Sequence, residues 1–170
     1  HVLLTGEREA YYGDFADAPA ARLARCLAEG FAFQGEMAPN LHRPRGTPSG
    51  HLPPTAFVAF LQNHDQVGNR AMGERLRALA PDAGVRAALA LVLLSPQIPM
   101  LFMGEEMGAR SPFLFFTDHA DGLADAVREG RRAEFSRFAA FADPARRAGI
   151  PDPNAQASFS ASRPVPPPDA

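Results

Sequence analysis

The chain contains no lysine, only one cysteine and no long uninterrupted apolar run. All 17 cationic residues are arginine, set against 19 acidic residues, and they form no basic block. A net charge of −2 without a basic stripe argues against a nucleic-acid partner. The longest apolar run, 87–94, is far shorter than the roughly 20 residues of a membrane-spanning helix. We therefore expect neither nucleic-acid nor membrane partners.

Cys26 has no second cysteine with which to form an internal disulfide, and its Ala-rich surroundings indicate a small buried apolar residue. The first residue is His, and no signal-peptide pattern follows it, so we expect that the natural start is missing. These features favour a reducing compartment, the cytoplasm. With 170 residues, 46% of them hydrophobic, the chain is long enough for one ordinary domain.

The most informative stretch is an apolar run, 57–61, that stops at the polar cluster 62–66. A run without polar members is typical of a strand buried on both faces of a parallel sheet. In α/β architectures the ligand lies outside the carboxyl ends of the strands. The adjacent imidazole and carboxylate of His64 and Asp65 are therefore candidate substrate contacts.

A helix and a second strand follow this cluster. Asp82 is a candidate N-cap for a helix that ends before Pro96, and Ile98 to Met103 then form a second apolar strand. Two strands joined by a helix are the pattern of a βαβ unit, whose strands lie parallel. The fold class predicted from the residues is therefore α/β, with Asp65 and Glu105 opening onto the same surface.

Further helices are expected near both ends of the chain. Asp17 is a candidate N-cap before the early-turn proline Pro19, and a second helical pattern covers 123–141. Within the latter, Arg131 and Arg132 are most simply a solvated face. Beyond residue 143 the chain becomes proline-rich and is expected to be extended or disordered.

Three stretches of the sequence carry a family resemblance: 61–71, 95–106 and 112–119. Taken together, they resemble the α-amylase family of glycoside hydrolases. The segments 1–7 and 29–36 fit the same family. The resemblance implies the C-terminal portion of a (β/α)8 barrel, incomplete in this chain, within residues 1–150 and including the seventh and eighth strands. The tail 151–170 would then be disordered, or a truncated remnant of a C-terminal β-domain.

The resemblance also implies an activity, the retaining hydrolysis of an α-1,4 bond that releases trehalose from malto-oligosyltrehalose, an α-glucan substrate. Such chemistry uses two carboxyl groups about 5 to 5.5 Å apart. Asp65 matches a third family carboxylate, which stabilises the transition state, and His64 matches an imidazole that contacts the same sugar. Asn63 and Gln66 are expected to bind substrate as well. The nucleophile and acid/base belong to earlier barrel strands, which nothing here matches, and no metal or cofactor is implied.

Three alternatives remain open. One is a related branching or debranching enzyme, which the sequence 66–70 disfavours because such enzymes more often carry Glu after the His-Asp doublet. A second is a metal-dependent phosphohydrolase with Asp118 and His119 as a second ligand pair, disfavoured because such doublets belong on helices. The third is a noncatalytic carbohydrate-binding or structural remnant.

Two other clusters have structural readings beside functional ones. Adjacent Glu105 and Glu106 point to opposite sides of an extended segment, so we expect one of them to be structural, pairing with an arginine or capping a helix. Phe113, Phe115 and Phe116 could stack on a sugar ring, but core packing is the default for such a cluster.

Overall fold

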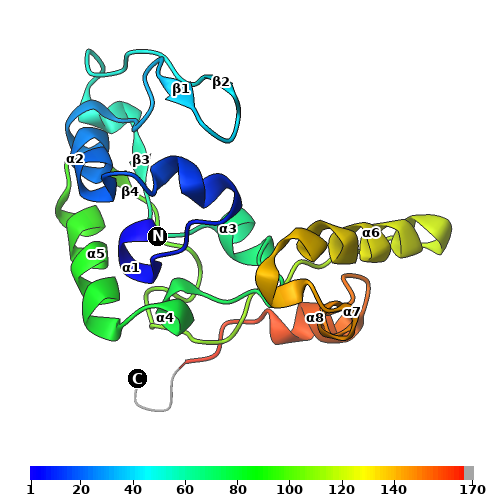
Figure 1. Ribbon diagram of the computed structural model, residues 1–170. Coiled ribbons are helices and arrows are strands. Elements are labelled where there is room, and N and C mark those ends of the chain that lie inside the picture. The colour runs from blue at the N-terminus through cyan, green and yellow to red at the C-terminus, as the bar shows by residue number, and fades with distance from the viewer. Residues whose placement is uncertain (167–170) are drawn as a thin grey trace. The chain divides into compact units, whose positions relative to one another are not determined.

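A computed structural model describes residues 1–166 (Figure 1). The chain divides into two compact units, the first formed by 1–61 and 80–100 and the second by 62–79 and the residues from 101 onward. The first unit has a core of Ala32, Phe33 and Ala38. The partly buried Cys26 packs against that core, as expected for an apolar cysteine, and burial raises the pKa of its thiol.

The first unit combines helices with two pairs of very short strands (Figure 1). Its helices are α1 (Val2–Thr5), η1 (Ala10–Phe15), α2 (Pro19–Glu29), η2 (Pro54–Ala56) and α5 (Asp82–Leu94). Its strands are β1 (Met37–Ala38), β2 (Arg43–Pro44), β3 (Val58–Ala59) and β4 (Ile98–Pro99).

The βαβ prediction is confirmed, because β3 and β4 pair in parallel on either side of α5 in the sequence. The ladder consists of Ile98 N–H donating to Phe57 O at 3.0 Å and Met100 N–H donating to Ala59 O at 2.9 Å. Both strands are shorter than predicted, and Val58 is 53% exposed. Ile98 is 49% exposed as well, so the expectation of burial on both faces is wrong for this chain.

The helix predicted over 123–141 ends earlier, because α6 (Asp121–Glu134) gives way to the 3-10 turns η3 (Phe135–Arg137) and η4 (Ala139–Phe141). The other two predicted helices are present, but both predicted N-caps are wrong. Pro19 is the first residue of α2, as predicted, yet the cap position is Ala18 rather than Asp17. Likewise α5 begins at Asp82, with Pro81 at the cap position. In both cases the aspartate lies one residue away from the cap position, Asp17 before it and Asp82 after it.

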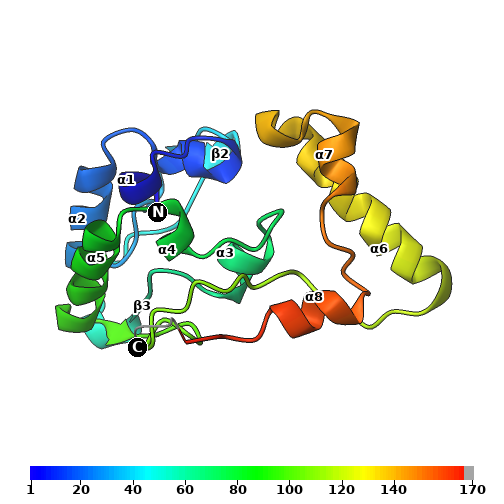
Figure 2. The ribbon, with the colours of Figure 1, turned by 90° about the horizontal axis from the view of Figure 1, so that it is seen from below.

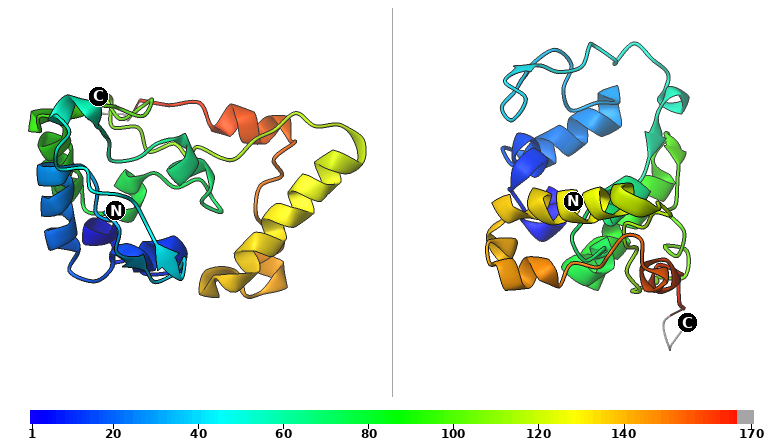
Figure 3. Two further views of the ribbon diagram at one scale, coloured as in Figure 1. Left: turned by 90° about the horizontal axis from the view of Figure 1, so that it is seen from above. Right: turned by 90° about the vertical axis from the view of Figure 1, so that its right-hand side faces the viewer.

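The second unit is helical among its described residues and contains α3 (His64–Gly68), α4 (Leu76–Leu79), α6 (Asp121–Glu134), η3 (Phe135–Arg137), η4 (Ala139–Phe141), α7 (Pro144–Ala148) and α8 (Gln156–Ala161). α7 and α8 overlap in Figure 1, but the turned view of Figure 2 separates them. Figure 3 shows the chain leaving α6 and passing through α7 before it reaches α8. Ala71, Phe135 and Ile150 form the core, with Phe138 and Phe141 against it.

Helix α8 corrects the expectation of an extended tail over 151–170. Ser158 and Ser162 are buried, and the Ser158 hydroxyl donates to Asp152 O at 2.6 Å. The Ser162 hydroxyl accepts from Leu114 N–H at 3.0 Å, which ties the segment to a distant part of the chain. These serine contacts, invisible in the composition, let a proline-rich segment fold. The end of the predicted tail, 167–170, lies outside the described residues.

Candidate functional site

The His-Asp doublet lies at the beginning of α3, a five-residue helix that follows β3 after a short connection. Asn63 is its N-cap, with the side-chain Oδ1 accepting from Gln66 N–H at 2.9 Å. The polar cluster is therefore placed after the strand, as predicted, but on a helix rather than at the last strand residue. A helical position for His64 and Asp65 no longer argues against a metal-binding doublet. That alternative therefore depends on whether further metal ligands lie nearby.

His64 and Asp65 point their polar groups into solvent. Their side chains are 72% and 71% exposed, and His64 Nε2 lies 3.4 Å from Asp65 Oδ1. A side-chain contact as exposed as this contributes little to stability. The doublet is thus accessible to a ligand, and the fold has little need of it.

The side chains of the neighbouring amides, Asn63 and Gln66, are less exposed than those of His64 and Asp65. Asn63 already uses its side-chain oxygen to cap α3. Gln66 is half-buried, and within the part of the chain described its side-chain Oε1 is buried without a hydrogen-bond partner. A buried carbonyl oxygen of this kind gains from any donor that reaches it. Sugar contacts by Asn63 and Gln66 stay predictions.

Gln62, to which the sequence analysis gave no role, links the segment before α3 to the segment after β4. Its side-chain Oε1 accepts from Leu76 N–H at 2.9 Å, and its Nε2 donates to Glu105 Oε1 at 3.0 Å. The other Glu105 oxygen accepts from Phe102 N–H at 2.7 Å. Burial raises the pKa of the Glu105 carboxyl, and these two hydrogen bonds offset part of the rise.

Glu105 and Glu106 both make internal contacts, whereas one structural glutamate was expected, and they accept hydrogen bonds from backbone N–H groups and Gln62 rather than from an arginine or a helix end. Besides the Glu105 contacts above, Glu106 Oε2 accepts from Gly104 N–H at 2.8 Å. Arg75, almost fully buried beside this segment, donates to Ser111 O at 2.7 Å and to Met103 O at 2.8 Å. The segment after β4 is thus held by a buried arginine and by Gln62.

Arg131 corrects the expectation of a solvated arginine pair, since its side chain is buried with 8% exposure. Its Nη2 donates to Gly68 O at 2.7 Å and to Arg70 O at 2.8 Å. The guanidinium carbon lies 4.8 Å from the centre of the Phe115 ring and 5.3 Å from that of Phe135. No local pattern marks such a residue, because its partners are far away in the sequence.

The aromatic cluster forms a chain of edge-to-face contacts, with ring centres 5.1 Å apart for Phe102 and Phe113, 5.8 Å for Phe113 and Phe116, and 5.3 Å for Phe116 and Phe159. Phe115 instead lies against Arg131. The rings thus pack against one another and against Arg131, but Phe116 is 37% exposed and none of the three predicted residues is fully buried, so sugar stacking stays a prediction.

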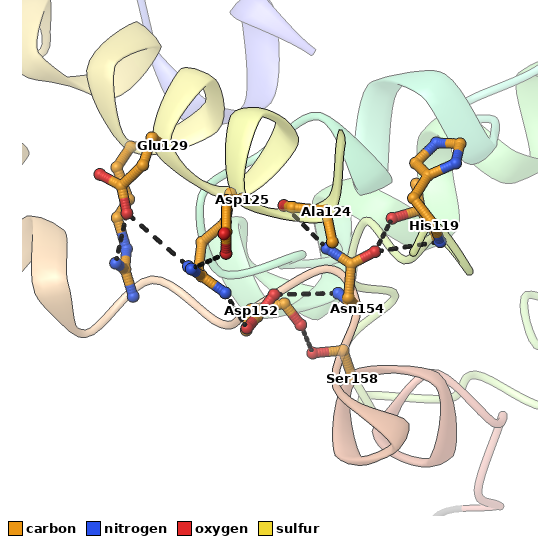
Figure 4. Close-up of polar contacts among 10 residues, drawn as sticks. His119, Ala124, Asp125, Glu129, Asp152, Asn154 and Ser158 are labelled. Carbon is orange, nitrogen blue, oxygen red and sulfur yellow. Dashed lines mark hydrogen bonds and ion pairs between the residues drawn. The ribbon is translucent and has the colours of Figure 1, made fainter. Parts of the chain in front are cut away.

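Of the second doublet, Asp118 and His119, His119 joins a polar network at the start of α6 through its backbone N–H (Figure 4). Asn154 Oδ1 accepts from His119 N–H at 3.2 Å, and Asn154 Nδ2 donates to Ala124 O at 3.1 Å. Among residues 1–166 no three His, Cys, Asp or Glu side chains are grouped so that they could hold a metal ion. The phosphohydrolase alternative therefore lacks a ligand set in the described chain.

Comparisons with known proteins give one consistent result. The chain is 44% identical over 164 residues to malto-oligosyltrehalose trehalohydrolase of Arthrobacter ramosus, which covers 95% of the chain and 27% of that protein. It is 44% identical over 135 residues to the protein of the same name from Saccharolobus solfataricus, covering 79% of the chain and 24% of the relative. The chain is a relative of the malto-oligosyltrehalose trehalohydrolases. This confirms the resemblance found in the sequence.

A solved structure supports the relation. The solved structure bears the name "Putative alpha Amylase from Salmonella typhimurium" and superposes on this chain with a TM-score of 0.89 at 56% identity. The superposition covers 97% of this chain and 27% of the solved chain. No protein-family model matches the chain. The chain thus spans about a quarter of the length of the trehalohydrolases it matches.

Proposed function

We propose that this chain forms part of a retaining α-glucosidic hydrolase that releases trehalose from malto-oligosyltrehalose by cleaving an α-1,4 bond. The observation that carries the proposal is the exposed His64–Asp65 pair at the start of α3, within a chain 44% identical to a trehalohydrolase. Asp65 would stabilise the transition state, and His64 would hydrogen-bond the same sugar. Asn63 and Gln66 would line the adjoining part of the sugar site.

In this chemistry Asp65 would be neither the nucleophile nor the acid/base. A retaining glycosidase passes through a covalent glycosyl-enzyme, which needs a nucleophile and an acid/base. Neither is assigned to a residue of this chain, so both would come from earlier barrel strands. The Asp65 side chain is exposed and lies beside that of His64, so its oxygens are available for the hydroxyls of the sugar at the cleaved bond.

The proposal extends to the fold. β3 and β4 would be the seventh and eighth strands of the (β/α)8 barrel, and residues 1–150 would belong to the barrel. The parallel pairing of β3 with β4 is what a barrel requires of neighbouring strands. The enzyme would act without a cofactor, in the cytoplasm.

The test is an assay of the complete polypeptide that carries this segment. Malto-oligosyltrehalose, the malto-oligosaccharide of the same length and a branched glucan are offered in parallel, and products are separated by chromatography. We expect trehalose release from the first substrate, with retained anomeric configuration at the new reducing end. Preferential attack on the branched glucan would instead support the branching or debranching alternative.

A chelator arm addresses the phosphohydrolase alternative. Carboxylate-based glycoside hydrolysis needs no metal-activated water. Trehalose release should survive treatment with a strong chelator. Loss of activity that a transition metal restores, or turnover of a phosphate ester, would overturn the proposal.

A further inference from the structure

Arg131 on α6 holds the chain directly after α3. Its Nη2 donates to the carbonyl oxygens of Gly68, the last residue of α3, and of Arg70. Carbonyl groups at a helix C-terminus have no partner within the helix, and here a buried guanidinium supplies one. Both bonds come from Nη2, and what lysine cannot reproduce is the planar guanidinium that lies over the rings of Phe115 and Phe135.

The environment of the Arg131 charge shows that the contact is specific. Burial lowers the pKa of this guanidinium, and the nearby Glu134 carboxylate offsets only part of that effect. Arginine nevertheless stays protonated in proteins, so the buried charge must be stabilised locally. The rings of Phe115 and Phe135 and the two carbonyl oxygens do this.

A short path of bonds connects Arg131 to Asp65. The Asp65 carbonyl oxygen accepts from Asn69 N–H at 3.0 Å, and Asn69 lies between the two residues that Arg131 holds. Because the Asp65 side chain is 71% exposed, its direction is set by the backbone of α3 and not by packing. The start of that short helix is fixed by the Asn63 cap and by Gln62, and its end is fixed by Arg131.

The helix that carries Arg131 is itself anchored (Figure 4). Arg128, one turn earlier on α6, donates to Asp152 Oδ2 at 3.1 Å, and Asn154 Nδ2 donates to Ala124 O. The Asn154 backbone N–H, and after it Arg128, hold the pKa of Asp152 below its usual range. These contacts give the Arg131 side chain a fixed base.

We propose that Arg131 is a positioning residue for Asp65, which it orients through the C-terminal end of α3. The proposal rests on the function proposed above, in which Asp65 acts in the transition state. Loss of the double hydrogen bond would let α3 shift, and a displacement of about 1 Å at a reacting centre costs up to about 100-fold in rate. Ground-state binding by the rest of the sugar site would change far less.

The test is a double-mutant cycle in the complete polypeptide, with trehalose release as the assay. Arg131→Lys should lower kcat by about 10- to 100-fold and change KM less than about threefold. In an Asp65→Asn background the same substitution should lower kcat by less than about threefold, because the residue it positions is already disabled. Arg132→Lys is the matched control, since Arg132 pairs with Glu129 on the same helix and should leave kcat and KM unchanged.

Several outcomes decide the matter. An equal loss of kcat in the wild-type and Asp65→Asn backgrounds, or a loss confined to the melting temperature, would overturn the positioning role. If Asp65→Asn by itself leaves kcat intact, the proposed function fails instead, so the two failures are distinguishable. Should Arg131→Lys not fold, Phe115→Leu replaces it in the cycle, because it keeps the hydrogen bonds but removes one ring from the guanidinium. Phe115→Leu should lower kcat more in the wild-type background than in the Asp65→Asn background, by a smaller factor than Arg131→Lys. Equal losses of kcat in the two backgrounds would refute the proposal.

Discussion

The half-buried side chain of Glu105 follows β4 in the sequence. Its surroundings oppose the ionisation of its carboxyl group. Burial raises its pKa above the ordinary value of 4.5, and hydrogen bonds from Phe102 N–H and Gln62 offset part of the rise. A group whose pKa is higher in the folded state contributes stability at low pH. That contribution is complete below the unfolded pKa and is lost as pH rises through the folded pKa.

A glutamine at position 105 should remove this pH dependence. Relative to Glu105→Gln, the wild-type protein should be most stable near pH 4 and should lose that advantage as pH rises through the raised pKa of Glu105. Thermal melting of both proteins between about pH 4 and about pH 8 measures the difference. A wild-type advantage that grows with pH would contradict the assignment.

Some residues of the candidate site could be predicted from the sequence and others could not. The doublet His64–Asp65 stood out because both residues are adjacent and follow an apolar run. Gln62 and Arg131 did not, because the partners of Arg131 lie 61 and 63 residues away and those of Gln62 lie 14 and 43 residues away. Long-range hydrogen bonds leave no periodic signal in one sequence.

At the scale of elements, periodicity served where an element was long. The helices α2, α5 and α6 were predicted, whereas the five-residue α3 was not, since it is too short to show a helical repeat. The parallel order of β3 and β4 followed from the intervening α5. Helix α8 was missed because buried serines, and not an apolar face, hold it in place.

The cap of α3 separates a structural role of Asn63 from a sugar-binding one. Asn63→Ala removes the hydrogen-bond acceptor for Gln66 N–H and should cost about 1 kcal/mol of stability. Asn63→Asp keeps an acceptor and should melt like the wild type. If Asn63 also contacts sugar through its amide nitrogen, the Asp variant will show a raised KM at normal stability. An Ala variant that melts like the wild type would show that the cap is unimportant.

At the scale of the whole chain, apolar surface is exposed. In the first unit Leu94 is 86% exposed and Val58 is 53% exposed, and α2 and α5 border an apolar groove lined by Leu27, Ala87, Ala90, Leu91, Leu94, Ser95 and Pro96. Among the described residues, none of the helices has the length and apolar character needed to cross a bilayer. Exposed strand edges and apolar patches of this kind recruit other chains.

Residues 1–170 expressed alone should therefore self-associate and should not release trehalose, because the nucleophile and acid/base would come from elsewhere. Size-exclusion chromatography over a range of concentrations, thermal melting by circular dichroism and the trehalose assay test this together. A monodisperse, cooperatively melting monomer that turns over malto-oligosyltrehalose would refute both the association and the division of the site.

The central claim is that Asp65 acts in the transition state of glycoside hydrolysis, and its removal tests that claim most directly. Asp65→Asn retains the shape of the side chain but loses the charge, and kcat for trehalose release is measured in the complete polypeptide. An interaction made in the transition state lowers kcat and kcat/KM together when it is removed. We expect a loss of several orders of magnitude in kcat with an unchanged melting temperature, since the exposed side chain contributes little to folding. Near-normal hydrolysis by a folded Asp65→Asn variant would contradict the account.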